Sequence, residues 1–222
     1  MEKFAIIVAG GSGVRMGGGI PKQFQLLKSK PVLWYSIKAF ADAFDDIHII
    51  VVIPSVYEER TKSIIQQFSG RNIRITTGGD TRFQSVKNGL NLIGENGIVF
   101  IHDGVRCLVT PGLIHQCYAA TVEKGNAVPA IAATDTIRIE TGDSNRQIDR
   151  NSVRIIQTPQ TFYAKDIKAA FTQPDDPYFT DEASVIERKG IKINLIEGEA
   201  SNIKITRPVD LLIAEKILEE RR

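Results

Sequence analysis

The feature that most constrains the fold is an apolar run that leads directly into a glycine-rich stretch. Residues 4–9 are all apolar, and Gly10, Gly11 and Gly13 follow at once. A continuous apolar run of this length is typical of a strand that is buried on both faces. Glycine tolerates positive φ and lets backbone N–H groups approach a bound anion closely. The pattern predicts the first strand of a parallel sheet with an anion-binding loop at its end.

Two cations, Arg15 and Lys22, lie within this loop, and three interpretations compete for it. A dinucleotide-binding turn needs G-x-G-x-x-G, but Met16 stands where the third glycine should be. A P-loop needs Gly-Lys-Ser/Thr, which does not occur in the chain. The third alternative is a tight turn that is rich in glycine only because it is sharp. The many glycines together with the two cations favour phosphate binding, and a nucleoside triphosphate is the simplest ligand.

Strand-like and helix-like patterns alternate through the first half of the chain. Strands are expected over 4–9, Ile47–Ile53, 73–76, 98–102 and 127–131. Helices are expected over 31–44, 54–70, 81–92 and Pro111–Lys124. This rhythm predicts an α/β fold, with a doubly wound, mainly parallel, Rossmann-like sheet that carries helices on both faces. The 222 residues, 42% of them hydrophobic, suit one domain over residues 1–222.

The rhythm breaks after residue 133. Residues 136–140 alternate, 141–145 are turn-forming, and 147 onward can return as a second strand. The pattern predicts a β-hairpin arm at about 134–157, inserted into the α/β plan. Because a two-stranded hairpin is marginal alone in water, it should pack on something. Its own domain and a second subunit are both open alternatives.

The C-terminal third predicts shorter elements. Residues 158–160 indicate a kinked connection, and helices are expected over 165–171 and 180–189, the second with Thr180 as its N-cap. A strand is expected over 191–196. The alternation over 202–206 would place Lys204 on one face with Asn202 and Thr206, and Thr206 would cap the last helix.

Composition excludes several classes of function. The net charge is only +2, so there is no global basic field that would favour nucleic acid as a partner. No apolar run approaches the ~18 residues of a membrane span, so no membrane partner is expected. Two cysteines give no disulfide framework, and with no signal peptide we expect two inert thiols in a reducing cytoplasm. No triad pattern or histidine metal spacing occurs, which leaves transfer between phosphates as the favoured chemistry.

Polar residues follow several of the expected strands at their carboxyl ends. The turns 10–22, 78–82 and 102–106 should meet at one edge of the sheet, where doubly wound folds bind ligands. They carry Arg15, Lys22, Arg82, Asp103 and Arg106. Asp103 ends a buried strand well before the next helix, so it is a better candidate for a hard cation or a substrate hydroxyl than for a helix cap.

Other polar residues have an ordinary alternative to a functional role. Ser85 could cap the helix that follows Gly79 or hydrogen-bond a base. Lys204 could lie on a solvated face, and Arg150 could form a surface ion pair with Asp149. For three threonines, turn and cap chemistry is the stronger interpretation from sequence alone: Thr136, Thr158 and Thr180.

Several blocks together resemble a known family. Residues 9–16 followed by Pro21-Lys22-Gln23-Phe24 resemble the signature of sugar-phosphate cytidylyltransferases. Seven further blocks are similar to the 2-C-methyl-D-erythritol 4-phosphate cytidylyltransferase family, which belongs to non-mevalonate isoprenoid synthesis: 78–86, 102–106, 135–136, 149–150, 157–160, 180–184 and 202–208. The chain departs from the family in having Gly104 and Val105 where two alanines are common, and Cys107 where proline is usual.

The resemblance implies an enzyme that transfers a cytidylyl group from CTP to a polyol phosphate, with Mg²⁺ bridging the triphosphate. It implies that Arg15 and Lys22 are catalytic and that Asp103 is the metal-binding carboxylate. Nucleotide-binding residues would be Ala9, Gly10, Gly11, Ser12, Gly13, Arg15, Lys22, Gly79, Asp80, Arg82 and Ser85. Residues for the acceptor substrate would be Asp103, Arg106, Thr136, Arg150, Thr158, Thr180 and Lys204. The resemblance also implies a homodimer in which the hairpin arm embraces the partner, so that Thr136 and Arg150 serve the partner's site.

Two rivals stay open at this point. A ribitol-5-phosphate cytidylyltransferase would share the fold, the nucleotide and most of the motifs, and would differ only in the acceptor. A nucleotide-binding regulatory module would bind CTP without releasing pyrophosphate. The presence of both Arg15 and Lys22 argues against the regulatory module, because binding alone would not need both cations.

Overall fold

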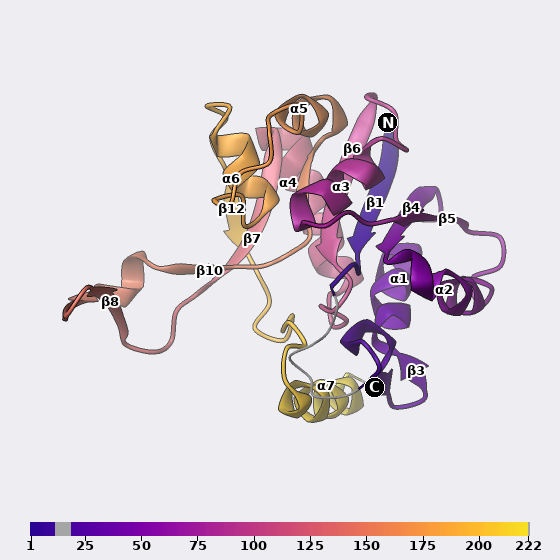
Figure 1. Cartoon of the computed structure of the whole chain (residues 1–222), viewed down its shortest axis with the longest axis horizontal. Helices are drawn as coiled ribbons and strands as arrows, with labels where there is room; N and C mark the ends of the chain where they lie inside the picture. The colour runs from indigo at the N-terminus through magenta and orange to yellow at the C-terminus, as the bar shows by residue number, and fades with distance from the viewer. Residues whose placement is uncertain (12–18, 222) are drawn as a thin grey trace.

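A twisted central sheet with helices on both sides dominates the computed structural model, which describes residues 1–11 and 19–221 (Figure 1). The strands are β1 (Glu2–Val8), β2 (Leu26–Leu27), β3 (Lys30–Pro31), β4 (Ile47–Ile53), β5 (Asn72–Thr77), β6 (Gly97–Asp103), β7 (Asn126–Ala132), β8 (Ile137–Thr141), β9 (Ser144–Ile148), β10 (Arg154–Ile156), β11 (Gln160–Tyr163) and β12 (Leu195–Glu197). The α-helices are α1 (Val32–Ala43), α2 (Glu58–Ile65), α3 (Arg82–Leu90), α4 (Pro111–Lys124), α5 (Ala164–Ala170), α6 (Glu182–Glu187) and α7 (Pro208–Glu220). Short 3₁₀ helices are η2 (Lys22–Phe24), η3 (Ser55–Tyr57) and η4 (Arg150–Ser152).

The main sheet has the strand order β10-β7-β11-β6-β1-β4-β5, and β12 also pairs with β7. Strands β6, β1, β4 and β5 are parallel neighbours. Strand β11 lies antiparallel between β6 and β7, and β10 is antiparallel to β7. The sheet is therefore mainly parallel, which confirms the expected α/β class.

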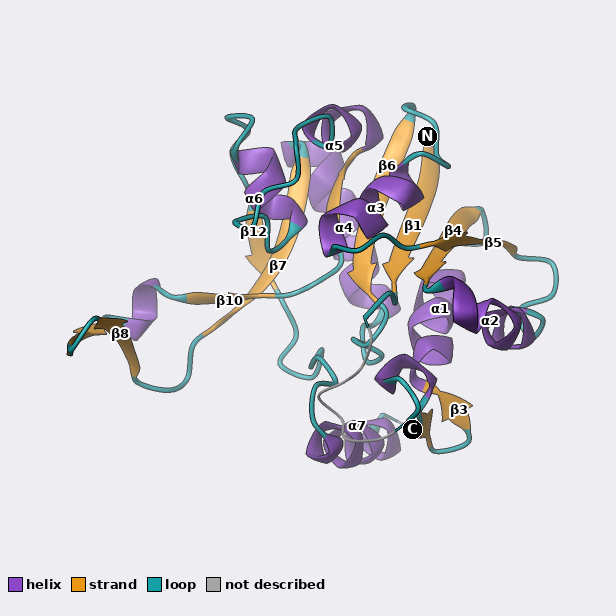
Figure 2. Cartoon of the chain, viewed as in Figure 1, coloured by secondary structure: helices purple, strands orange, loops and turns teal. Residues whose placement is uncertain are grey.

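Each face of the sheet packs on its own set of helices. In β1, Ala5 and Ile7 join a buried cluster with α1, α2 and α4, whereas Phe4 and Ile6 join a cluster with α3, α5 and α6. Figure 2 shows helices in front of and behind the strands. Burying one such isoleucine stabilises the fold by about 1.5–3 kcal/mol, which is why the strands read as continuous apolar runs. The two clusters confirm the doubly wound arrangement.

The central strands end level with one another, and this places the turns that follow them at one edge. Val8 of β1 pairs with Val52 of β4 and with Asp103 of β6. Beyond these pairs, the Gly104 N–H donates to the Val8 carbonyl at 2.8 Å. The Gly78 N–H donates to the carbonyl of Ile53, the last residue of β4, also at 2.8 Å. The backbone ladder therefore continues into the turns and fixes them against one another.

The hairpin of β8 and β9 extends away from the main sheet (Figure 1). Its strands pair from Ile137 with Ile148 to Thr141 with Ser144, so two residues form the turn. The first of them, Gly142, has a φ of +60°, which favours glycine. Most hairpin side chains are exposed. Beyond the hairpin, η4 and β10 lead the chain back to the sheet beside β7.

Two expectations for the C-terminal third were incomplete. The segment after the kink at Thr158 continues as β11, which the sequence did not predict. Of the strand expected over 191–196, only the end belongs to β12. Before β12, the side chain of Asn126 makes the hydrogen bonds that the backbone of a neighbouring strand would otherwise make. Its Nδ2 donates to the Lys192 carbonyl and its Oδ1 accepts from the Asn194 N–H, each at 2.8 Å.

Two predicted helix caps were also wrong. Asp181, and not Thr180, is the N-cap of α6, where its carboxylate accepts from the Ser184 N–H. The N-cap of α7 is Arg207. Thr206 precedes it, and both the backbone N–H and the hydroxyl of Thr206 donate to Asp210 Oδ2, at 2.7 and 2.9 Å. In both places an aspartate accepts these hydrogen bonds, because its negative charge is stabilised at the positive end of the helix dipole.

Candidate functional site

A cavity of about 420 Å³ opens at the edge of the sheet where the turns after β1, β5 and β6 meet. Its lining contains ten of the residues predicted from sequence: Ala9, Gly10, Gly11, Lys22, Gly79, Asp80, Arg82, Ser85, Asp103 and Lys204. Val8, Gln23, Thr81 and Val105 complete the lining. The sequence therefore predicted most of the residues that this cavity brings together.

Asp103 lies among three cations. Lys204 Nζ is 2.9 Å and Arg106 Nε 3.6 Å from its Oδ2, and Arg82 Nη2 is 3.4 Å from its Oδ1. Burial alone would raise the pKa of this carboxyl, but the three cations outweigh burial and hold the pKa well below its ordinary range. Asp103 is therefore ionised at neutral pH, and it holds three basic side chains around one wall of the cavity.

Arg82 is held from behind by a buried carboxylate. Glu182 of α6 is 1% exposed, and its two oxygens contact Arg82 Nη1 and Nη2, the second at 3.0 Å. Burial would lower the pKa of Arg82, but the charges of Glu182 and Asp103 raise it above its ordinary value. A chain of alternating charge thus runs from Glu182 through Arg82 and Asp103 to Lys204. It fixes the Arg82 guanidinium at the cavity edge.

Tight packing shapes the wall beside the turn after β5. The hydroxyl of Ser85 is buried and accepts the Gly79 N–H at 3.1 Å. A Cβ at Gly78 would lie 2.9 Å from Ser85 Oγ, and one at Gly79 would lie 2.5 Å from the Cβ of Gln84. Thr81, and not Ser85, is the N-cap of α3. These glycines let the backbone come close to α3, and both Gly79 and Ser85 line the cavity.

The start of the glycine-rich loop is fastened by a buried amide. Gln23, in η2, is 1% exposed, and its Nε2 donates to the carbonyls of Ala9 and Gly11 at 2.7 and 3.1 Å. Lys22, its neighbour in η2, lines the cavity. The Gln23 amide thus holds both ends of the Ala9–Gly11 segment beside Lys22. Ser12, Gly13 and Arg15, predicted to act here, lie outside the described residues.

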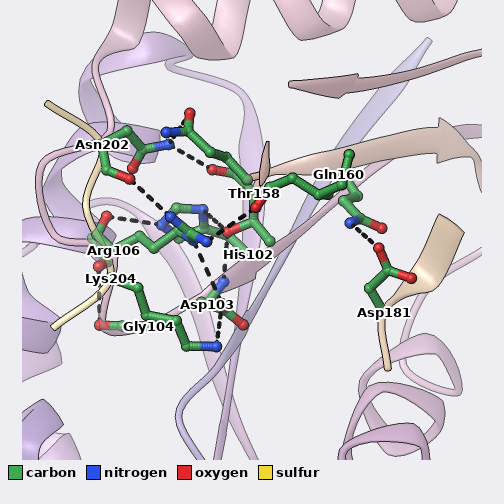
Figure 3. A network of polar contacts seen from close by, with 12 residues as sticks. His102, Asp103, Gly104, Arg106, Thr158, Gln160, Asp181, Asn202 and Lys204 are labelled. Atoms are coloured by element: carbon green, nitrogen blue, oxygen red, sulfur yellow. Dashed lines mark hydrogen bonds and ion pairs between the residues drawn. The ribbon is translucent and has the colours of Figure 1, made fainter. Parts of the chain in front are cut away.

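A buried polar network lies under the cavity (Figure 3). The Arg106 guanidinium donates to the carbonyls of Asn202 and Ile156 at 2.8 and 3.3 Å. The Asn202 Nδ2 donates to the Thr158 carbonyl at 2.9 Å. Asn202 and Ile205 are both fully buried and Lys204 is exposed, so the expected alternation over 202–206 is wrong. The bonds to Asn202 pull this segment inward and direct Lys204 toward Asp103.

The remaining predicted residues lie away from the lining of this cavity. Thr158 is 4% exposed, beneath Asp103. Thr136 and Arg150 are exposed at the base of the hairpin, where Arg150 Nη1 donates to the Thr134 carbonyl at 2.9 Å. Thr180 is exposed just before α6. One chain therefore does not bring Thr136, Arg150 and Thr180 to the wall around Asp103.

Sequence reasoning gave no role to three buried residues that organise the site: Gln23, His102 and Glu182. Glu182 falls in the first turn of the helix expected over 180–189, where an acidic side chain is common without any other role. Its position beside the apolar Ala183, Val185 and Ile186 was the available signal, since a carboxylate on a buried face needs a partner. His102 likewise ended an apolar run. No local pattern marked Gln23, because both its partners are backbone carbonyls on another segment.

His102 gives the protein a predictable pH dependence of stability. It is fully buried, and burial lowers its pKa to about 4, while Asp103 acts in the opposite direction. The unfolded chain takes up a proton at this residue below about pH 6.5, and the folded protein does not until about pH 4. Stability should therefore fall as the pH decreases through this window. Urea unfolding of wild type and His102→Gln measures this, and we expect a smaller loss in the variant.

The exposed His115 provides the control for this measurement. The His115→Gln variant should lose stability between about pH 6.5 and pH 4 as the wild type does. An equal slope in wild type and His102→Gln would contradict the assignment of the pH dependence to His102.

Two absences hold for the described part of the chain. No helix there is long and apolar enough to cross a membrane. Cys107 and Cys117 are both free and buried, and burial raises the pKa of each thiol to about 12. At neutral pH both are therefore protonated and unreactive, in agreement with the expectation of inert thiols.

Comparison with known proteins gives a consistent result. The family model described as 2-C-methyl-D-erythritol 4-phosphate cytidylyltransferase matches residues 4–220. Proteins of that name from Bacteroides fragilis and Phocaeicola vulgatus are 41% and 42% identical over 220 residues, covering 98% of this chain and 100% of each relative.

Solved structures agree in fold. The 4-diphosphocytidyl-2C-methyl-D-erythritol synthase of Anaerococcus prevotii is similar with a TM-score of 0.85 and 29% identity, covering 98% of both chains. The 2-C-methyl-D-erythritol 4-phosphate cytidylyltransferase of Thermus thermophilus is similar with a TM-score of 0.80 and 28% identity, covering 99% of this chain and 100% of that one.

Proposed function

This chain belongs to the 2-C-methyl-D-erythritol 4-phosphate cytidylyltransferase family, and we propose that the cavity at the ends of β1, β5 and β6 is its active site. The protein is a CTP-dependent cytidylyltransferase. It converts CTP and 2-C-methyl-D-erythritol 4-phosphate to 4-diphosphocytidyl-2-C-methyl-D-erythritol and pyrophosphate, a step in non-mevalonate isoprenoid synthesis.

The observation that carries the location is the meeting of backbone and cations at one edge. The glycine turn after β1 brings backbone close to the ligand, and Lys22, Arg82 and Lys204 supply positive charge around a cavity of about 420 Å³. Fixed donors and cations of this kind stabilise the charge that develops on phosphates during transfer. Neutral residues could bind a nucleoside, but they would leave the negative charge of a triphosphate uncompensated.

The proposed roles follow from the position of each group. The triphosphate of CTP lies along the glycine-rich loop beside Lys22, and the base lies in the part of the cavity that Gly79, Asp80 and Ser85 line. An oxygen of the acceptor phosphate forms a bond to the α-phosphorus, the bond from that phosphorus to the β-phosphate oxygen breaks, and pyrophosphate leaves. Arg15 and Lys22 stabilise the negative charge on the α-phosphate in the transition state.

The acceptor lies on the other side of the reacting phosphorus. Asp103 faces its hydroxyls from the cavity wall, Arg106 directs its positive charge toward the phosphate from beneath that wall, and Lys204 contributes a third polar group. The N–H of Asp103 is already bonded to the Thr158 hydroxyl at 3.0 Å, so its carboxylate is held in a fixed direction. Holding both substrates in line removes much of the entropic cost of bringing them together.

We also propose Mg²⁺ as the cofactor, held mainly by phosphate oxygens of CTP. In the described ranges, no three His, Cys, Asp or Glu side chains form a group that could hold a metal alone. Asp103 Oδ2 is engaged by Lys204, but among residues 1–11 and 19–221 Oδ1 makes only the 3.4 Å contact with Arg82 and can serve as a ligand. One carboxylate together with substrate phosphates is a common way of binding this ion, so the residues fit. The bound ion neutralises charge on the triphosphate.

The hairpin arm is proposed to complete the acceptor site of a partner subunit in a homodimer. Its exposed strands and the exposed Arg150 at its base support this, because they lack an intramolecular site to serve. Replacing Arg150 with alanine should raise the KM for the acceptor by about tenfold, the effect of one lost charged contact, and leave the KM for CTP nearly unchanged.

Mixing that variant with Lys22→Ala tests the sharing of sites. If subunits exchange freely, half of the dimers are mixed and each has one intact site. At acceptor concentrations well below KM, activity should therefore recover to about a quarter of wild type, against about a twentieth for the two variants kept apart. Each variant alone at the same concentration is the control. Absence of recovery in exchanging dimers would indicate that each site is built within one chain.

The choice of acceptor is tested by incubating the protein with CTP, Mg²⁺ and either 2-C-methyl-D-erythritol 4-phosphate or ribitol 5-phosphate while pyrophosphate is measured. We expect the higher kcat/KM with the methylerythritol substrate. Faster turnover with ribitol 5-phosphate would contradict the assignment. Binding of CTP with no pyrophosphate from either acceptor would indicate a regulatory module instead.

A further inference from the structure

His102 is a buried titratable group to which the proposed mechanism gives no role. It is the residue before Asp103 in β6, is fully buried, and packs against the Phe40 ring at a centroid distance of 5.3 Å. Both ring nitrogens nevertheless have polar partners. Its Nε2 lies 3.1 Å from the Arg106 carbonyl oxygen, and its Nδ1 lies 3.0 Å from Thr158 Oγ1.

These partners define one tautomer of the ring. A carbonyl oxygen only accepts, so Nε2 must carry the hydrogen. In the neutral ring Nδ1 is then an acceptor, and it takes the hydrogen of the Thr158 hydroxyl. That hydroxyl oxygen in turn accepts from the Asp103 N–H at 3.0 Å. A directed chain of hydrogen bonds therefore runs from Asp103 through Thr158 and His102 to Arg106 (Figure 3).

The chain ties together the two ends of the turn that carries the acceptor-side groups. The Asp103 backbone is held at one end and the Arg106 backbone at the other, and their side chains face each other with 3.6 Å between Nε and Oδ2. The Arg106 guanidinium is anchored further by the carbonyl of Asn202. The Asp103 carboxylate also accepts from Arg82 Nη2 of the Gly79–Ser85 wall at 3.4 Å, but Arg82 is held independently by the two oxygens of Glu182.

We propose that His102 is a positioning residue for the transfer reaction, which fixes Asp103 and Arg106 relative to each other through Thr158 and so orients the acceptor phosphate. The inference rests on the proposed function, in which Asp103 and Arg106 face the acceptor. It affects the two substrates unequally: loss of His102 should impair the use of the acceptor much more than the binding of CTP, which keeps Lys22 and the glycine-rich turn after β1.

Two variants test the hydrogen bonds of the two ring nitrogens separately. His102→Asn keeps an acceptor near the Nδ1 position, and His102→Gln keeps a donor near the Nε2 position. Each should raise the KM for 2-C-methyl-D-erythritol 4-phosphate by about tenfold, the scale of one lost hydrogen bond, and lower kcat as the acceptor is misplaced. The KM for CTP should change by less than about twofold, and the exposed His115→Gln is the control.

The assays are run below the unfolding temperature of each variant. A lower Tm with both KM values and kcat unchanged would show that His102 is only structural and would overturn the proposal. Equal increases in both KM values would overturn it too. The wild type separates failure of the proposed function from failure of the role of His102. If the wild type releases no pyrophosphate with either acceptor, the proposed function fails before His102 is tested.

A measurement on the wild type keeps the inference testable even if neither variant folds. Nitrogen-15 NMR of the imidazole rings reports which nitrogen carries the hydrogen. We expect a neutral ring with the hydrogen on Nε2 at pH 7, and a change in its signals when the acceptor phosphate is added to the complex with a non-hydrolysable CTP analogue. A hydrogen on Nδ1, or signals that do not respond to the acceptor, would overturn the proposed chain.

Discussion

Replacing Lys22 with alanine should lower kcat by at least about 10²-fold and change the affinity for CTP much less, because this is the scale for removing one charge-stabilising group from a preorganised site. Lys22 begins η2 next to Gln23, whose amide holds the start of the glycine-rich loop. In the proposed complex this position places the cation beside the reacting phosphates. Steady-state pyrophosphate release gives kcat, and equilibrium titration with CTP gives the affinity.

Lys38→Ala is the matched control for this experiment, because Lys38 lies on α1 and pairs only with Asp42 and the Trp34 ring among the described residues. It should behave as wild type in both measurements. If Lys22→Ala abolishes CTP binding while the bound substrate still turns over at the wild-type rate, Lys22 acts in the ground state and its proposed transition-state role is wrong.

Replacing Arg82 with methionine should lower the free energy of unfolding by about 3 kcal/mol, the lower end of the cost of breaking a buried ion pair. The variant leaves the Glu182 carboxylate 1% exposed and without its partner. The lower end applies because the Arg82 side chain is 28% exposed and partly solvated. Urea unfolding at pH 7 measures the loss, and CTP affinity should fall as well because Arg82 lines the cavity.

The double variant Arg82→Met/Glu182→Gln separates the two effects. Removing the buried charge should restore most of the lost stability, but CTP affinity should stay low because the guanidinium is still missing. Glu187→Gln, on the exposed side of α6, is the control for the helix. If the double variant is less stable than Arg82→Met, Glu182 has a stabilising partner other than Arg82 and the assignment fails.

The parts of the fold that sequence predicted are those with strong local signals. The apolar runs of β1, β4 and β6 and the proline that opens α4 marked the parallel sheet and its helices. Because parallel strands end at one edge, the same reasoning predicted that Lys22, Arg82 and Asp103 would meet. Tertiary position here follows from strand order and needs no side-chain detail.

The parts that sequence did not predict depend on partners far along the chain. Strand β11 is four residues long and pairs antiparallel with β6 and β7, so nothing in its own pattern distinguishes it from a loop. Glu182 meets Arg82 across 100 residues, and His102 meets Thr158 across 56. Such contacts depend on how distant segments pack, and local sequence preferences carry no information about that packing. The cap at Asp181 was missed because Thr180 and Asp181 are both good N-cap residues.

The central claim is that CTP binds in the cavity at the ends of β1, β5 and β6, with its phosphates beside Lys22 and its base against the wall that Gly79 and Ser85 line. A crystal structure with CTP and Mg²⁺ tests it most directly. The account predicts density for the triphosphate along residues 9–11 and at Lys22, with the cytosine against the cavity wall of Gly79, Asp80 and Ser85 and the α-phosphate facing Asp103. Nucleotide density in another cavity, or the base placed at Lys22 and the phosphates at Ser85, would contradict it.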